Sequence, residues 1–311
     1  KGHVIPEGKY KGWWEATKRK LREDMQFIVP AKRTDPLELR EDDFDPSQGL
    51  IEQFRAARDL RAKVKAVEAI IKEIHVFKDQ QDTLVELVGE ISEIARKGVK
   101  LQYVPAAELV LICEELQSRI KGYEPAPGQI STVDILAVGE SAIPGLFEDL
   151  SLTRLRQVLK SFPDAFGEEW VAKMLGLVPS CNLRSIGEIA NCLEAAGHQP
   201  GLLSYMENGL QQRSLTSDAL AWICRERKGL AASVFTPTLC LSVMSSLEAD
   251  QLNEEGSVRS ANRLRDLVAD DGGLIPDLID GANINTIRNF AGRLVGSASF
   301  DELTRKSLMA R

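Results

Sequence analysis

Apolar residues recur at three- and four-residue steps through most of the chain, and this is the spacing of one buried helix face. The rhythm is unbroken from residue 50 to residue 77, which predicts one long charged helix with Ser47 as its N-cap. Two further periodic segments, 82–96 and 106–120, predict a second and a third helix. Residues 47–124 are therefore expected to form a helical hairpin or three-helix unit.

Shorter apolar segments fill residues 125–311, and Pro or Gly follows several of them. They cover residues 152–162, 169–178, 183–196, 202–210, 218–227, 239–247, 258–268 and 284–295. Short loops between helices favour antiparallel neighbours, and repeated helices of this kind build solenoids. The segments lack the fixed positions of tetratricopeptide, ankyrin or leucine-rich repeats. We predict an irregular α-solenoid, loosely HEAT-like.

Residues 1–46 have a different pattern and are expected to form a small basic subdomain ahead of the hairpin and the solenoid. Residues 8–23 predict a short helix, because the spacing of Trp14, Thr17 and Leu21 gives it one apolar face. Residues 27–29 are expected to be extended and to pair with residues 37–39. The predicted fold class is therefore all-α, in three parts: 1–46, 47–124 and 125–311.

Positive charge is concentrated in this first part. Residues 9–22 hold six Lys or Arg, one Glu and two of the four tryptophans, whereas the whole chain has a net charge of −7. A basic, Trp-bearing segment on an acidic chain is typical of a contact with nucleic acid or a large partner protein. The candidate contact residues are Lys11, Trp13, Trp14, Lys18, Arg19, Lys20, Arg22, Lys32 and Arg33.

Two interpretations of these residues stay open. In the first, Trp13 and Trp14 anchor a small subdomain and the lysines only coat its surface. In the second, the cations contact phosphates or an acidic protein surface. Adjacent residues of a helix point about 100° apart, so one tryptophan can be buried while the other makes the contact. Trp170 and Trp222 lie inside the repeats and are expected in the core.

The sequence carries no recognisable catalytic, nucleotide-binding or metal-binding motif. The three histidines and five cysteines are His3, His75 and His198 with Cys113, Cys181, Cys192, Cys224 and Cys240. No CxxC, HxxxH or HExxH spacing occurs among them, so we expect no metal, no cofactor and no small-molecule substrate. The cysteines are expected to be buried, reduced thiols of a cytoplasmic, non-enzymatic protein without a membrane span.

Several blocks near the N-terminus resemble a segment of unusually long bacterial GreA/GreB-type transcription elongation factors. They are Val4–Gly8, Gly12–Lys18, Leu21, Phe27–Lys32, Pro36 and Leu39–Arg40, and later blocks at 155–163, 170–179, 219–227 and 306–311 look similar. The resemblance implies a helical extension of such a factor, with RNA polymerase as partner. The family's acidic coiled-coil tip is missing from the turn at residues 75–82, so the resemblance implies no catalytic residue here.

Three functional hypotheses follow from the sequence. The leading one is a non-catalytic helical region of a Gre-like factor that engages RNA polymerase or nearby nucleic acid through residues 9–33. The second is a general α-solenoid scaffold that binds a protein partner along residues 125–311 and has no link to transcription. The third, an independent nucleic-acid-binding module, is the least favoured, because the acidic body would repel phosphate.

Overall fold

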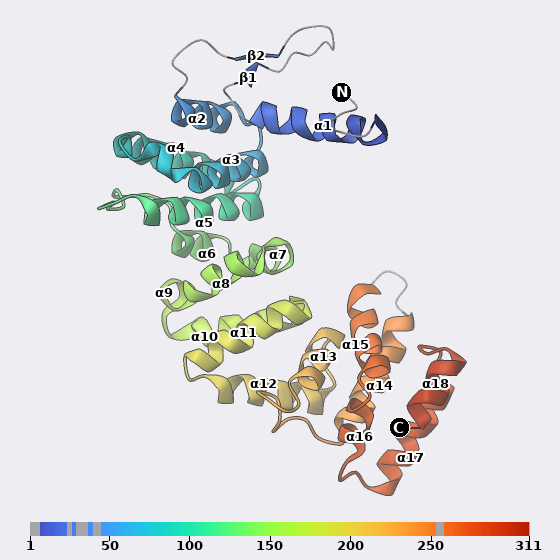
Figure 1. Cartoon of the computed structure of the whole chain (residues 1–311). Helices are drawn as coiled ribbons and strands as arrows, with labels where there is room; N and C mark the ends of the chain where they lie inside the picture. The colour runs from blue at the N-terminus through green and yellow to red at the C-terminus, as the bar shows by residue number, and fades with distance from the viewer. Residues whose placement is uncertain (1–6, 24–26, 29–36, 40–44, 253–257, 311) are drawn as a thin grey trace. The chain divides into compact units, whose positions relative to one another are not determined.

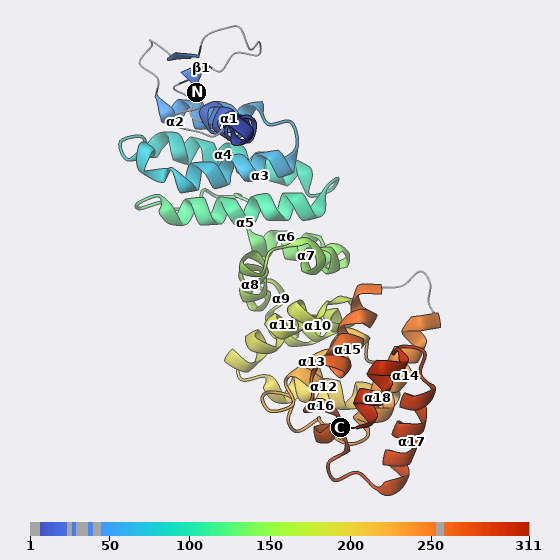
Figure 2. The ribbon, with the colours of Figure 1, turned by 45° about the vertical axis from the view of Figure 1, so that its right-hand side comes forward.

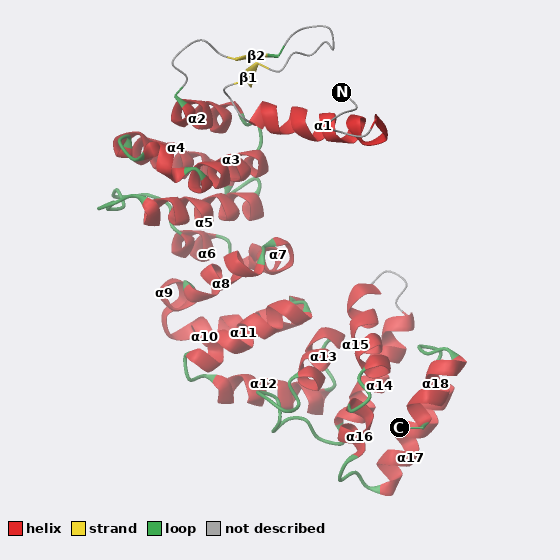
Figure 3. Ribbon diagram, in the orientation of Figure 1, coloured by secondary structure: helices red, strands yellow, loops and turns green. Residues whose placement is uncertain are grey.

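The computed structural model describes residues 7–23, 27–28, 37–39, 45–252 and 258–310 (Figure 1). Apart from one short pair of strands, the regular structure among these residues is helical, and successive helices pack on one another (Figure 3). The all-α helical-repeat class predicted from the sequence is confirmed. The chain divides into two compact units, Lys1–Ile130 and Ser131–Arg311. The finer three-part division made from the sequence stays a prediction.

The first unit is a stack of helices with a small ribbon. Its elements are α1 (Glu7–Glu23), β1 (Phe27–Ile28), β2 (Glu38–Leu39), α2 (Pro46–Ala56), α3 (Leu60–Lys72), the 3-10 helix η1 (Ile74–Phe77), α4 (Gln81–Gly98) and α5 (Tyr103–Arg119). α5 packs against both α3 and α4, and α2 packs on α3. Figure 2 shows this stack after a 45° turn. Residues 47–124, predicted as a helical hairpin or three-helix unit, contain most of α2 together with α3, η1, α4 and α5.

The single long helix predicted for residues 50–77 is wrong, because the segment is divided into α2, α3 and η1. Ala57 has an extended backbone that ends α2, and the carboxylate of Asp59 accepts a hydrogen bond from the Ala62 amide to start α3. The Asp59 cap starts a new helix at this point, although the helical spacing of apolar residues continues through the break.

The predicted N-cap of this region is also corrected. Asp45, not Ser47, caps α2, and its carboxylate accepts hydrogen bonds from the backbone amide of Ser47 at 2.9 Å and from the Ser47 hydroxyl at 2.5 Å. Gln80 bonds to both residues, at 2.7 Å to Asp45 and 2.6 Å to Ser47, and so ties the start of α2 to the start of α4. The hydrogen bonds from Ser47 and Gln80 lower the pKa of Asp45. Ser47 is fully buried in this contact.

The predicted basic helix and strand pair are both present. α1 extends over Glu7–Glu23, and β1 pairs antiparallel with β2 in the register Phe27 opposite Leu39 and Ile28 opposite Glu38. β1 also packs against α1. The end of α1 carries Lys20, whose positive charge is favourable near a helix C-terminus.

The second unit continues with shorter helices. They are α6 (Thr132–Val138), η2 (Glu140–Ala142), α7 (Ile143–Asp149), α8 (Leu152–Lys160), α9 (Phe162–Phe166), η3 (Gly167–Glu169), α10 (Trp170–Leu177), η4 (Val178–Ser180), α11 (Leu183–Ala195), α12 (Gln199–Gln212), α13 (Ser217–Arg225), α14 (Leu239–Leu252), α15 (Val258–Asp270), α16 (Leu274–Ile279), α17 (Ile284–Gly296) and α18 (Glu302–Met309). Sequence analysis anticipated most of the α-helices, with an amphipathic helix expected over residues 299–311 where α18 lies, but missed α6, α7, α9 and α16. Those four have seven residues or fewer, too short for a clear period.

The core of this unit is built from the apolar faces of consecutive helices. α11 packs against α8, α12 and α13, and α13 in turn packs against α14 and α15. Trp222 of α13 is buried, as predicted. The prediction that Trp170 lies in the core is wrong: it is half-buried at the start of α10, where its ring meets that of His198 edge-on at 5.2 Å.

Arginine–carboxylate pairs join helices that are distant in the sequence. Arg156 of α8 makes two hydrogen bonds, at 2.6 and 2.7 Å, to Glu188 of α11. Arg293 of α17 reaches Glu248 of α14 at 2.6 Å. Paired bonds of this kind fix the orientation of the two groups as well as their separation. These pairs therefore add a directional constraint on how α8 lies against α11 and α17 against α14.

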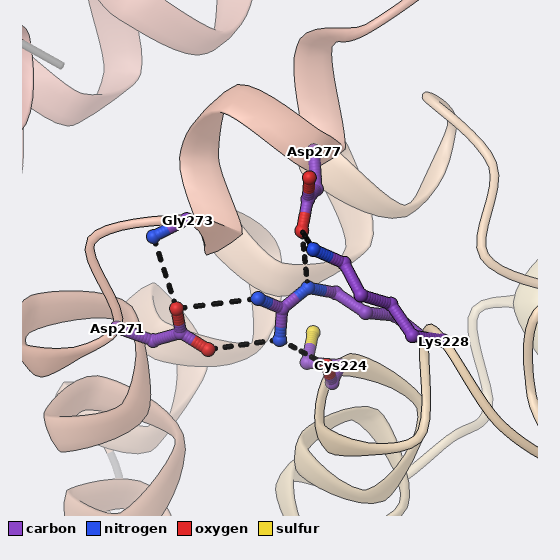
Figure 4. A network of polar contacts seen from close by, with 6 residues as sticks. Cys224, Lys228, Asp271, Gly273 and Asp277 are labelled. Atoms are coloured by element: carbon purple, nitrogen blue, oxygen red, sulfur yellow. Dashed lines mark hydrogen bonds and ion pairs between the residues drawn. The ribbon is translucent and has the colours of Figure 1, made fainter.

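Arg227, just after α13, is the centre of a polar network whose other members are labelled in Figure 4. Its guanidinium donates to Asp271 at 2.8 and 3.2 Å, to Asp277 at 2.6 Å and to the carbonyl oxygen of Cys224 at 3.1 Å. The side chain of Arg227 is only 12% exposed. Because Asp271 and Asp277 lie in the α15–α16 loop and in α16, this one cation holds three segments together.

The carboxylates of this network are more acidic than usual. Burial alone would raise the pKa of Asp271, but the hydrogen bonds from Arg227 and from the Gly273 amide outweigh it and lower the pKa. Hydrogen bonds from Arg227 and Lys228 lower the pKa of Asp277. For Arg227, burial disfavours the charged form and would lower the pKa. The hydrogen bonds to Asp277 and Asp271 outweigh burial, so the pKa of Arg227 is raised.

Among the described residues, no helix is both long and apolar enough to cross a bilayer. The longest helix of the second unit, α12 or α14, has 14 residues, whereas a span needs about 20.

We predict that Arg227→Ala destabilises the second unit by about 1–3 kcal/mol, because two half-buried carboxylates lose their shared partner. Urea denaturation followed by circular dichroism measures the change. Arg265→Ala is the matched control, since Arg265 pairs with its exposed neighbour Asp266 among the described residues, and its loss should change little. Equal effects from the two variants would contradict the assigned role.

The same network predicts an acid dependence of stability. Asp271 and Asp277 have lowered pKa values in the folded chain, so their stabilisation is present above the unfolded pKa of about 3.8 and is lost as pH falls through the folded values. Thermal melts of the parent below about pH 4 should therefore show a steeper loss than melts of Arg227→Ala. Parallel curves would show that the carboxylates are not coupled to Arg227.

Candidate nucleic-acid interface

One exposed face of α1 carries a tryptophan between two lysines. Trp13 is 44% exposed, and Lys9 and Lys20 are both exposed. At about 100° per residue, Lys9 lies about 40° and Lys20 about 20° around the helix from Trp13. The three side chains therefore share one face, which we call the Trp13 strip (Lys9, Trp13, Lys20). With about 1.5 Å of rise per residue, the strip spans about 16 Å along the helix.

The neighbouring face of α1 is the one turned inward. Tyr10, Trp14, Thr17, Lys18 and Leu21 are all half-buried. The side chain of Lys18 is 21% exposed, lies 3.9 Å from a Glu15 oxygen and sits 5.8 Å from the centre of the Trp14 ring. The question left open by the sequence is answered: of the two adjacent tryptophans, Trp13 is the exposed one and Trp14 is the anchor.

Aromatic contacts hold the Trp13 ring in place. Its centroid lies 5.7 Å from that of Tyr10 and 6.1 Å from that of Trp14, both in tilted arrangements. Such separations fall in the range of favourable aromatic pairs. Trp13 is thus an exposed ring supported from beneath by half-buried rings, which limits its rotamers before any partner arrives.

The structure treats the other candidate residues differently. Lys11 is exposed but lies about 160° around α1 from Trp13, so it points away from the strip. The backbones of Arg19 and Arg22 belong to α1, and their side chains are outside the described part of the structure, as are Lys32 and Arg33 altogether. Lys9 was not among the sequence-predicted contacts. The helical wheel could have found it, because it stands four residues before Trp13.

The second unit holds a polar groove with a volume of about 770 Å³. It is formed by the α10–α11 connection, the end of α12, the start of α13, α14 and one side chain of α15. Its lining includes Asn182, Arg213, Thr216, Asp218, Ser246 and Arg263. Gly209 and Leu215 shape one wall: a Cβ at Gly209 would come within 2.3 Å of the Leu215 side chain, so a larger residue there requires Leu215 to shift.

The polar groups of this groove are largely engaged with one another. The carboxylate of Asp218, with its side chain 6% exposed, accepts hydrogen bonds from the Leu183 amide at 3.0 Å and from Arg263 at 3.1 Å. The hydroxyls of Ser217 and Ser246 are 2.7 Å apart. Such a surface suits a polar partner segment.

The cysteine thiols are free, and burial keeps them protonated. Four are buried and Cys192 is half-buried. Burial raises the pKa of Cys113, Cys181 and Cys224 to about 12 and that of Cys240 to about 11. A thiol with such a pKa carries almost no thiolate at neutral pH and is a poor nucleophile and metal ligand. Within the described residues, no group of three His, Cys, Asp or Glu side chains is arranged to hold a metal ion.

Comparison with known proteins gives one match, and it falls on the α1 segment. Residues 1–44 match the GRAD helix-turn-helix domain family. Among the described residues of this range, α1 is the one helix and β1–β2 form the only strand pair. Searches of curated proteins and of solved structures found no match to this chain. The similarity to a helix-turn-helix family therefore concerns the region that carries the Trp13 strip.

Proposed function

We propose that this chain is a non-catalytic helical interaction protein of the transcription machinery, and that residues 1–44 contact nucleic acid held by RNA polymerase. The observation that carries the proposal is the exposed Trp13 strip, which places an aromatic ring between two cations on one helix face. Lysines supply the salt-dependent attraction to phosphates on which non-specific nucleic-acid binding rests.

Two further arguments support this proposal. The same residues are similar to a helix-turn-helix family, and helix-turn-helix modules commonly bind DNA through one helix. The resemblance of the N-terminal blocks to long GreA/GreB-type factors points to RNA polymerase as the setting. The acidic remainder of the chain is consistent with binding confined to α1, because it repels the phosphate backbone.

Replacing Lys9, Lys11 and Lys20 together by Ala should weaken binding to a fluorescent DNA oligonucleotide in low salt. The slope of log affinity against log salt should become shallower by about 1.4 to 1.8, because Lys9 and Lys20 each contribute about 0.7 to 0.9 when they neutralise a phosphate, whereas Lys11 points away from the strip. Fluorescence anisotropy at several salt concentrations measures both quantities.

The matched control removes three exposed lysines elsewhere in the first unit, namely Lys97, Lys100 and Lys121. This variant has the same net charge as the α1 variant, so it separates a local contact from a general effect of charge. Equal losses from both variants, or binding that does not respond to salt, would overturn the proposal that α1 makes the contact.

The polar groove of the second unit favours a second candidate, a helical scaffold that binds a protein segment. Concave helical-repeat surfaces commonly bind extended partners. The groove is large enough for several side chains, and hydroxyl, amide, carboxylate and guanidinium groups line it.

A pull-down with RNA polymerase loaded on a nucleic-acid template distinguishes the two candidates. Ala249 is exposed and lines the groove, so Ala249→Trp fills the groove with little cost to folding, whereas Ala137→Trp places the same bulk at an exposed position of α6 as a control. If α1 makes the contact, the α1 lysine variant loses the polymerase and Ala249→Trp keeps it. The opposite result assigns the contact to the groove. No capture by the parent overturns the transcription proposal and leaves a scaffold with a different protein partner.

A further inference from the structure

We infer that the Trp13 strip prefers single-stranded nucleic acid, with Trp13 stacking on an unpaired base while Lys9 and Lys20 bind the flanking phosphates. This inference rests on the proposed contact between α1 and nucleic acid and specifies its ligand. It concerns the first unit alone, where α1 is seen in Figures 1 and 2.

The first argument is the exposure of the indole. An aromatic ring in water gains by stacking on the face of a base, and only unpaired bases offer a free face. A duplex presents base edges in its grooves, and these are read by hydrogen-bonding side chains and methyl contacts. The indole of Trp13 has one N–H donor and no acceptor. Its chemistry therefore fits a base face better than a base edge.

The second argument is the spacing of the cations. Lys9 and Lys20 stand on either side of Trp13, about 6 Å and about 10 Å away along the helix axis. Their separation of about 16 Å matches four or five nucleotides of a stacked strand, at about 3.4 Å each. A strand lying along α1 can therefore place phosphates at both lysines and a base over Trp13. This arrangement is the stacking platform with a cationic track that single-strand binders use.

The third argument is the support of the Trp13 ring by Tyr10 and Trp14. A ring already held by its neighbours loses little conformational freedom when a base stacks on it. Lys18 is set over Trp14 and beside Glu15 on the inward side, so it adds positive charge near the platform without blocking the outer face of Trp13.

The test compares oligo(dT) of about ten nucleotides with a duplex of the same length, using the whole chain and fluorescence anisotropy. Oligo(dT) should bind at least several-fold more tightly than the duplex, because one stacked base contributes a factor of about five or more. Trp13→Ala should weaken oligo(dT) binding about tenfold and change duplex binding little. Trp13→Phe should recover part of the loss, since a smaller ring still stacks.

Leu101→Ala is the control for losing an exposed apolar side chain, because Leu101 is 86% exposed in the first unit and lies outside α1. It should leave both affinities unchanged. Duplex binding equal to or tighter than oligo(dT) binding, or an unchanged oligo(dT) affinity in Trp13→Ala, would overturn this inference and leave the α1 contact standing. Absence of salt-dependent binding to either oligonucleotide would overturn both.

Discussion

Burial of one apolar stripe per helix is the constraint on which the rest of the structure depends. Apart from α1, α4 and α5, the described helices have 14 residues or fewer. Helices of this length are marginal alone, so each is stable only when its stripe meets a neighbour. Ile70, Leu116, Ile189 and Cys224 illustrate the result, since each is completely or almost completely buried between helices. Layered packing follows from short helices and leaves outward faces free for partners.

Arginine–carboxylate pairs add directional contacts to the close-packed apolar stripes. In a pair such as Arg156–Glu188, two hydrogen bonds fix the orientation of the guanidinium relative to the carboxylate. Arg227 extends the same device to three segments at once. Both ends of α13, which lines the polar groove, are held by arginines. Near the start of α13, Arg263 donates to Asp218. Just after its end, Arg227 donates to Asp271.

Sequence analysis identified the fold class because helical periodicity is a local property of the chain. It failed where a single residue overrode the rhythm, as Asp59 did by starting a new helix inside the run from 50 to 77. It also located the basic Trp segment and the apolar face of its helix, since Trp14, Thr17 and Leu21 are half-buried. It did not place Lys9 beside Trp13 on the exposed face, because the contact residues were chosen by charge and not by their position around the helix. The networks of Arg227 and Asp218 join residues 44 to 50 positions apart, beyond any local pattern.

The distribution of the tryptophans gives each unit its own fluorescent reporter. Trp13 and Trp14 lie in α1 of the first unit, while Trp170 and Trp222 lie in the second. An exposed indole such as that of Trp13 emits at longer wavelength and is reached by soluble quenchers. The buried indole of Trp222 emits at shorter wavelength and is protected from quenchers. Emission from α1 and from the interior of the second unit can thus be separated in the same molecule. The order in which the two units lose structure then becomes readable without attaching any external dye.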